Sequence, residues 1–204
     1  MRSDTCLVSP VHLDCECGVE ERYKFGGILA ASNGRLYCAP CYSSVLLEID
    51  PVTYKSAEID LPTTNLDTRL RGSCIVEGSD ARLYINPDVI EGRRVGPDVY
   101  WDFNTCPWRF SYVLAFDLSS KDISVLRGPY VDMCAIWGMA TAPSGKIYCA
   151  GVDAVLVIEP SIDVKDHADF RLIETGIAAW SGIALGEDGW LYCAPGEAHR
   201  SYVL

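Results

Sequence analysis

Short apolar runs separated by polar turn residues recur along the chain. Three stretches carry nearly the same wording: residues 27–40 read GILAASNGRLYCAP, residues 138–151 read GMATAPSGKIYCAG, and residues 182–195 read GIALGEDGWLYCAP. Each stretch has an apolar run, a turn pair ending in glycine, and a second apolar run. This order predicts a β-hairpin closed by a two-residue turn, because glycine accepts the positive φ that such turns require.

Further strand patterns follow each hairpin. After the first hairpin, residues 45–49 are mostly apolar and run into Asp50-Pro51, a turn pair. Residues 55–61 then alternate polar and apolar side chains, as a solvent-facing strand does. The unit that repeats is therefore expected to hold four strands.

A degenerate copy lies between the first and the third hairpin. It begins at Gly72, and its distance to the repeat tyrosine predicts a hairpin loop longer by two residues than in the other copies. Successive repeat tyrosines are 47, 64 and 44 residues apart, and the insertion at residues 88–110 accounts for the long interval. These tyrosines are Tyr37, Tyr84, Tyr148 and Tyr192. A period in the mid-forties with four strands per unit is typical of a β-propeller blade.

We therefore predict a single all-β domain, an incomplete or fragmentary β-propeller with about four blades of four antiparallel strands. The blades are expected at about residues 27–71, 72–136, 138–181 and 182–204, with residues 1–26 as the candidate for completing the last one. The fourth copy stops inside its expected third strand, so a fragment is favoured over a closed ring of four. An open propeller exposes sheet edges and an apolar blade face, which predicts self-association.

The repeat wording resembles the broad propeller superfamily that includes YVTN, NHL and kelch repeats. It is most similar to uncharacterised tandem propeller repeats of protists and algae, through the turn pair, the Tyr-Cys-Ala strand and the Val-Leu-x-Ile-Asp-Pro type of ending at residues 45–51. The resemblance covers residues 27–204 apart from the insertion and implies the fold. Its motifs shape turns and cores, so it implies no particular function.

Two enzyme families share this fold, the regucalcin-like lactonases and the streptogramin lyases. Resemblance to the first would imply a metal held in the central channel by Glu, Asn and Asp side chains, for which no matching positions stand out. Resemblance to the second would imply a catalytic histidine on an upper loop. His199, beside Glu197, lies in such a loop but has no matching motif around it.

The insertion at residues 88–110 is the most distinctive candidate for a binding surface. It belongs with the loops that are expected to gather on one face of a propeller, and His199 lies in another of them. It carries residue types that are enriched in binding hot spots, namely Arg93, Arg94, Tyr100, Trp101, Trp108 and Arg109. The competing interpretation is a loop folded over the blade edge with its aromatic side chains buried.

The chain has ten cysteines, and their placement favours buried free thiols over disulfides. Three of them occupy one position of three repeats, namely Cys38, Cys149 and Cys193. A four-sulfur zinc site built from Cys15, Cys17, Cys38 and Cys41 is the alternative, but Cys38 belongs to the repeat wording. We therefore expect no metal, no cofactor and a cytoplasmic location.

Two further sets of residues receive a structural interpretation. Three carboxylates share the position after the third strand, and turn formation is favoured over a catalytic ring; they are Asp50, Asp117 and Glu159. Three bulky aromatic residues near the repeat glycines are expected to pack between blades; they are Phe25, Trp137 and Trp180. No catalytic residue is assigned.

The charge balance narrows the class of partner. The formal net charge of −11 repels phosphate backbones, so a nucleic-acid partner is not expected. No apolar run reaches the roughly 18 residues of a membrane span, so a membrane partner is not expected either. The favoured function is a non-catalytic ligand-binding or protein-interaction module whose partner is a protein or a small molecule. The alternatives are a metal-dependent hydrolase, lactonase or lyase with its site at the central channel, and a structural propeller without a ligand.

Overall fold

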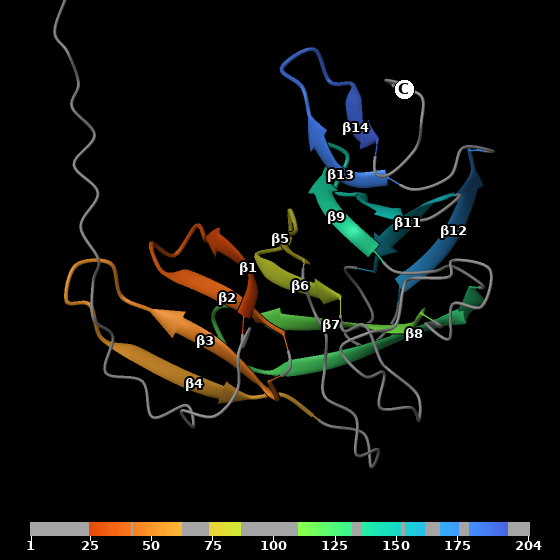
Figure 1. Ribbon diagram of the computed structural model, residues 1–204. Helices are drawn as coiled ribbons and strands as arrows, with labels where there is room; N and C mark the ends of the chain where they lie inside the picture. Colours follow the sequence, from red (N-terminus) through yellow and green to blue (C-terminus); the bar gives the residue numbers. More distant parts are fainter. Residues whose placement is uncertain are drawn as a thin grey trace, which may run out of the picture.

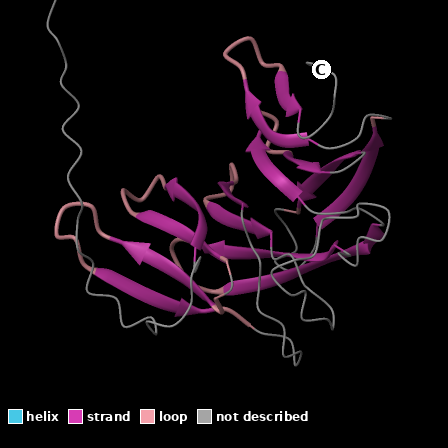
Figure 2. Cartoon of the chain, in the orientation of Figure 1, coloured by secondary structure: helices cyan, strands magenta, loops and turns pink. Residues whose placement is uncertain are grey.

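The computed structural model describes residues 25–41, 43–62, 74–86, 110–131, 136–151, 154–161, 168–175 and 180–195. These residues form strands and turns without a helix (Figure 2). The strands make three four-stranded sheets and one two-stranded sheet, all antiparallel, and within each sheet every strand pairs with the next along the chain. The expectation of an all-β chain of four-stranded antiparallel units is confirmed.

The strands follow the sequence in four groups. The first sheet holds β1 (Phe25–Ala30), β2 (Leu36–Pro40), β3 (Val45–Ile49) and β4 (Ser56–Asp60). The second holds β5 (Cys74–Glu77), β6 (Arg82–Asn86), β7 (Phe110–Asp117) and β8 (Ile123–Val131). The third holds β9 (Ile136–Thr141), β10 (Ile147–Gly151), β11 (Ala154–Pro160) and β12 (Ala168–Glu174), and the fourth holds β13 (Trp180–Leu185) and β14 (Leu191–Pro195).

The sheets stack face to face in an open arc (Figure 1). The first strands of successive sheets contact one another, β1 with β5, β5 with β9, and β9 with β13, so they form the inner edge of the arc. The described sheets do not close into a ring (Figure 1). This arrangement matches the expected incomplete propeller.

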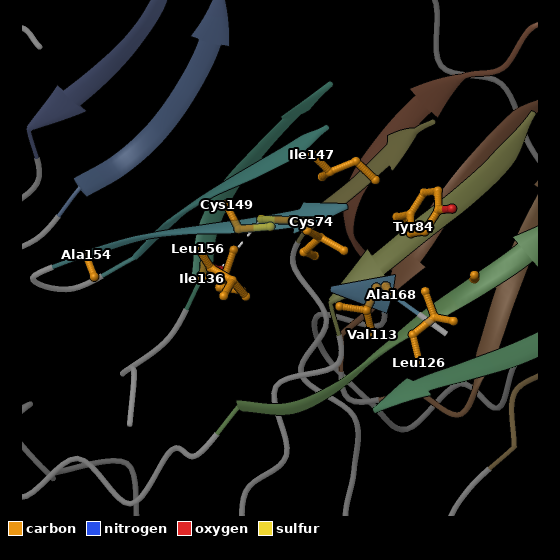
Figure 3. Close-up of a cluster of buried hydrophobic side chains, with 12 residues drawn as sticks. Cys74, Tyr84, Val113, Leu126, Ile136, Ile147, Cys149, Ala154, Leu156 and Ala168 are labelled. Carbon is orange, nitrogen blue, oxygen red and sulfur yellow. Dashed lines mark hydrogen bonds between the residues drawn. The ribbon is translucent and has the colours of Figure 1, made fainter. Parts of the chain in front are cut away.

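Hydrophobic cores lie between neighbouring sheets, because successive residues of a strand point to opposite faces. In β6, Leu83 and Ile85 face the first sheet, whereas Tyr84 faces the third. The core between the second and third sheets is shown in Figure 3 and includes Cys74, Tyr84, Val113, Leu126, Ile136, Ile147, Cys149 and Leu156. Each sheet thus needs a neighbour on both faces to bury its apolar side chains.

The turns that join the first two strands of each sheet share one geometry, which corrects the prediction of two-residue turns. In the first sheet, the Ala31 amide donates to the Arg35 carbonyl and the Gly34 amide to the Ala31 carbonyl, both at 2.9 Å, which leaves a three-residue loop. The last loop residue is left-handed in all four turns: Gly34 (φ 78°), Ala81 (φ 59°), Gly145 (φ 82°) and Gly189 (φ 82°). Such a loop combines a type I turn with a left-handed residue.

The second sheet has a turn of the same length as the others, so the prediction of a longer loop there was wrong. Cys74 lies opposite Asn86 in the sheet, as Gly138 lies opposite Ala150. Cys74, and not Gly72, therefore occupies the position of the repeat glycine. The prediction aligned the repeats by matching Gly72 to the glycines of the other copies. The pairing of the strands shows which residues are equivalent, and it gives this position to Cys74.

In three of the four hairpins, a hydrogen bond between the turn and the second strand explains why Asn or Asp stands four residues before Tyr. Asn33 Nδ2 donates to the Tyr37 hydroxyl at 2.9 Å, Tyr84 OH donates to Asp80 Oδ2 at 2.7 Å, and Tyr192 OH donates to Asp188 Oδ2 at 2.7 Å. Burial, together with the bond to Asp80, raises the pKa of Tyr84. The repeated tyrosine thus fixes the turn of its own sheet.

The prediction that bulky aromatic residues pack between sheets is confirmed for Trp180 and wrong for Trp137. Trp180 is fully buried against the third sheet, whereas Trp137 is 43% exposed. Ile136 takes the buried position in the third sheet instead, with 1% exposure. Trp137 lies one residue further along its strand, and a shift of one residue moves a side chain to the other face. Phe25 is half-buried and packs on the far face of the first sheet.

Candidate functional site

The predicted binding residues all lie outside the described residues. They are Arg93, Arg94, Tyr100, Trp101, Trp108, Arg109 and His199, and their role stays a prediction. The structure does place both ends of the insertion, which leaves β6 after Asn86 and enters β7 at Phe110. Asn86 is fully buried at a position where the other repeats have alanine. The insertion therefore joins the second and third strands of its sheet.

The inner strands β1, β5, β9 and β13 contain one carboxylate, Glu77. Its side chain accepts hydrogen bonds from the Ser32 amide at 2.8 Å and from the Ser32 hydroxyl, and Thr141 Oγ1 donates to its backbone carbonyl at 2.7 Å. Glu77 thus connects the first three sheets. Among the described residues, no group of three or more His, Cys, Asp or Glu side chains could hold a metal ion.

One hollow lies between the turns of the second and third sheets. It encloses about 140 Å³ and is lined by Ser79, Asp80, Ser144, Gly145, Lys146, Glu159 and Pro160. Ligand sites usually enclose about 300 to 1,000 Å³, so the hollow is smaller than a typical small-molecule site. Its one cation, Lys146 Nζ, is paired with Glu159 Oε1 at 2.7 Å. The hollow therefore offers little to a charged ligand.

Of the three carboxylates predicted to form turns after the third strand, Asp50 and Asp117 do so, whereas Glu159 lies within β11 and pairs with Lys146 instead. Asp50 Oδ1 accepts the amides of Val52 at 2.8 Å and Thr53 at 3.1 Å. Asp117 Oδ1 accepts the amides of Ser119 and Ser120, both at 2.9 Å. The backbone hydrogen bonds from Val52 and Thr53 lower the pKa of Asp50.

As predicted, none of the described cysteines forms a disulfide; Cys38, Cys74, Cys149 and Cys193 are buried and Cys41 is half-buried. Cys15 and Cys17 lie outside the described residues, so the four-sulfur zinc site stays untested. Figure 3 shows that the side chains of Cys74 and Cys149 lie next to each other in the core between the second and third sheets, without a disulfide. Alignment of the repeats does not predict this contact. Burial, together with the neighbouring Cys74, raises the pKa of Cys149 and disfavours its reactive thiolate.

The junction of the first two sheets shows how a repeat tyrosine is covered. The rings of Tyr37 and Phe116 lie 5.8 Å apart. Lys121 Nζ lies 5.6 Å from the Tyr37 ring centre and donates to the Tyr37 hydroxyl at 3.1 Å and to Glu48 Oε2 at 2.8 Å. Burial opposes the charge of Lys121, but these hydrogen bonds outweigh it and raise its pKa. Tyr37 is fully buried as a result.

The fourth sheet is different, because one of its faces is exposed. We name this surface the open blade face and define it by the exposed residues Ala184, Trp190, Tyr192 and Ala194. Trp190 is 69% exposed and Tyr192 is 43% exposed. Cys193 and Ile183 point the other way and pack against the third sheet. The sequence predicted that an open propeller exposes an apolar blade face but did not place it on the fourth sheet, although tryptophan stands there where the other repeats have Arg or Lys.

Comparisons with known proteins agree on the fold. No protein-family profile matches the sequence, and no curated protein matches it. A putative gluconolactonase structure is similar over 87% of this chain, with a TM-score of 0.60 and 12% identity. A streptogramin B lyase is similar over 83% of it, with a TM-score of 0.58 and 13% identity. The fold is a β-propeller.

A third similar structure is PorZ, a surface component of the type-IX secretion system of Porphyromonas gingivalis. The similarity covers 88% of this chain, with a TM-score of 0.59 and 13% identity. The chain spans 59% of the putative gluconolactonase, 47% of the lyase and 25% of PorZ. Neighbours of this fold include enzymes and proteins without a stated activity, so the likeness shows architecture alone.

Proposed function

We propose that this chain is a non-catalytic interaction module that binds a protein through the open blade face. The observation that carries the proposal is the exposure of Tyr192, next to the exposed Trp190, at a position that is fully buried in the first two sheets. Tyr37 and Tyr84, at the position of Tyr192, are fully buried by the sheet that follows them. An apolar face of this kind is typical of a protein contact.

Other features support a protein partner. The net charge of −11 disfavours nucleic acid and anionic membrane surfaces. The five described free cysteines suit a reducing compartment such as the cytoplasm. The described part of the chain contains no helix with the length and apolar character of a membrane span.

The rival function is a metal-dependent hydrolase or lyase, which the gluconolactonase and lyase neighbours suggest by fold. A thermal-shift experiment with Ca²⁺, Mg²⁺, Mn²⁺ and Zn²⁺, each against EDTA, separates the two. An ion at 100 times its dissociation constant stabilises a folded protein by about 2.7 kcal/mol, which raises the melting temperature (Tm) of a chain of this size by about 5–10 °C. The interaction module predicts no rise for any ion, and a rise of that size would favour the enzyme.

A further inference from the structure

Two thiols meet across the junction of the second and third sheets. Cys74 comes from β5 and Cys149 from β10, and their side chains lie next to each other in the core (Figure 3). The Cys74 thiol donates a hydrogen bond to the Ile136 carbonyl oxygen of the third sheet, with 3.7 Å between sulfur and oxygen. The Cys74 side chain therefore crosses the junction and reaches β9, the strand that pairs with β10.

The place of Cys74 in its repeat explains why its sulfur reaches the next sheet. Strand pairing gives Cys74 the position that Gly138 has in the third sheet. A Cβ atom added to Gly138 would lie 2.8 Å from the Gly182 Cα of the fourth sheet, so adjacent inner strands come close together at this position. A side chain there points at the next sheet, and for Cys74 that sheet carries Cys149.

The other two repeat cysteines lack such a neighbour among the residues of their described clusters. Cys38 and Cys193 hold the position of Cys149 in the first and fourth sheets. Neither the cluster around Cys38 nor the cluster around Cys193 contains a second cysteine. Cys193 is therefore a matched control for Cys149, because it is a buried repeat thiol without the Cys74 partner.

Burial makes both thiols slow to react while the sheets stay together. Cys74 is 7% exposed and Cys149 is fully buried. Burial raises the pKa of Cys149, and the neighbouring Cys74 raises it further, so the reactive thiolate is scarce at neutral pH. An oxidant therefore reaches the pair when the junction between the two sheets opens locally.

We propose that Cys74 and Cys149 form a reversible disulfide with a small disulfide such as oxidised glutathione as the oxidant, and that this bond joins β5 to β10. The Cys74 thiolate, from the less buried residue, attacks one sulfur of the small disulfide, which forms a mixed disulfide and releases one small thiol. The Cys149 thiolate then attacks the Cys74 sulfur, forms the protein disulfide and releases the second small thiol. The two protein thiols lose two protons and two electrons, which the small disulfide takes up.

The bond is expected to make the folded chain more resistant to heat. It closes a loop from residue 74 to residue 149 and so restricts the unfolded chain. For a loop of this length in a chain of this size, the Tm should rise by about 5–15 °C. The proposal is independent of the partner of the open blade face.

Peptide mapping of the full chain tests the pairing. The chain is equilibrated with oxidised glutathione, its remaining thiols are alkylated, and tryptic peptides are identified by mass spectrometry. Peptides 72–82 and 147–165 contain Cys74 and Cys149 as their only cysteines, so a link between them identifies the pair. The variants are Cys74→Gly, which restores the residue of the other repeats, and Cys149→Ala, with Cys193→Ala as the control. Circular dichroism melts with and without dithiothreitol give the Tm of each chain.

We expect the two peptides to be linked in most of the wild-type chain and of Cys193→Ala, and dithiothreitol to reverse the link. The oxidised chains should melt about 5–15 °C above the reduced chains, and this rise should be lost in Cys74→Gly and Cys149→Ala. Alkylation of both Cys74 and Cys149 after exhaustive oxidation would overturn the proposal, and so would a link from either peptide to a different cysteine. A linked chain whose Tm does not exceed that of the reduced chain would overturn it as well. The peptide map of the wild-type chain decides the pairing even if a variant does not fold.

Discussion

Two repeat glycines provide a sharp test of how the fourth sheet is docked. Gly138 in β9 and Gly182 in β13 lie at equivalent positions of adjacent inner strands, yet their surroundings differ. A Cβ atom added to Gly138 would lie 2.8 Å from the Gly182 Cα and 2.8 Å from the Ile183 backbone nitrogen. A Cβ atom added to Gly182 would have no heavy atom within 4 Å. Alanine should therefore be rejected at one position and accepted at the other.

The expected magnitudes follow from this geometry. Gly138→Ala forces two backbones apart, which costs about 1–3 kcal/mol, and the stiffer unfolded chain offsets about 0.4–1 kcal/mol of that. The net loss of up to about 2.6 kcal/mol lowers the Tm by up to about 10 °C in a chain of this size. Gly182→Ala causes no clash and only restricts the unfolded chain, so the Tm should stay unchanged or rise by up to about 4 °C.

Thermal and urea melts followed by circular dichroism measure both variants against the wild type. Equal Tm shifts in the two variants would refute the close approach of β9 and β13, because only that approach leaves less space at Gly138 than at Gly182. Stabilisation by Gly138→Ala would refute it as well.

Three other predictions concern the turns, the core and the acid limit. Ala81→Gly relieves a left-handed alanine and should raise the free energy of unfolding by about 0.5–1 kcal/mol in urea melts, whereas Gly34→Ala should lower it by a similar amount. Leu114 is fully buried in the core between the first and second sheets. Leu114→Ala should lower the free energy of unfolding by about 2–5 kcal/mol, and a decrease below about 1 kcal/mol would contradict this burial. The lowered pKa of Asp50 stabilises the fold above the unfolded value near about 3.9 and ceases to do so as pH falls through the folded value. The Tm should therefore fall below about pH 4, and less steeply in Asp50→Asn, as melts across pH will show.

Much of the architecture could be predicted from the sequence because its repeats are local. Each hairpin places its apolar runs, its turn glycine and its tyrosine within about 15 residues, and the four-strand unit follows from the period. The interval of 64 residues between Tyr84 and the next repeat tyrosine was correctly assigned to an insertion between the second and third strands, whose ends lie on β6 and β7.

The errors arose where strand register decides the outcome. Trp137 and Trp180 both precede a repeat glycine, but by one and two residues, and that difference exposes one and buries the other. Gly72 was chosen as the repeat glycine by identity, although pairing gives that place to Cys74. Contacts between sheets, such as Lys121 with Tyr37 and Glu48, join residues 84 and 73 positions apart and leave no local pattern.

The central claim is that equivalent repeats differ in exposure only through the sheet that covers them. Hydroxyl-radical footprinting with mass spectrometry tests it most directly, at low micromolar protein concentration. Tyr37 and Tyr84 are fully buried and Tyr192 is 43% exposed, so oxidation should be slow at the first two tyrosines and fast at the third. Similar oxidation rates at all three tyrosines would contradict the stacked arc and its open blade face.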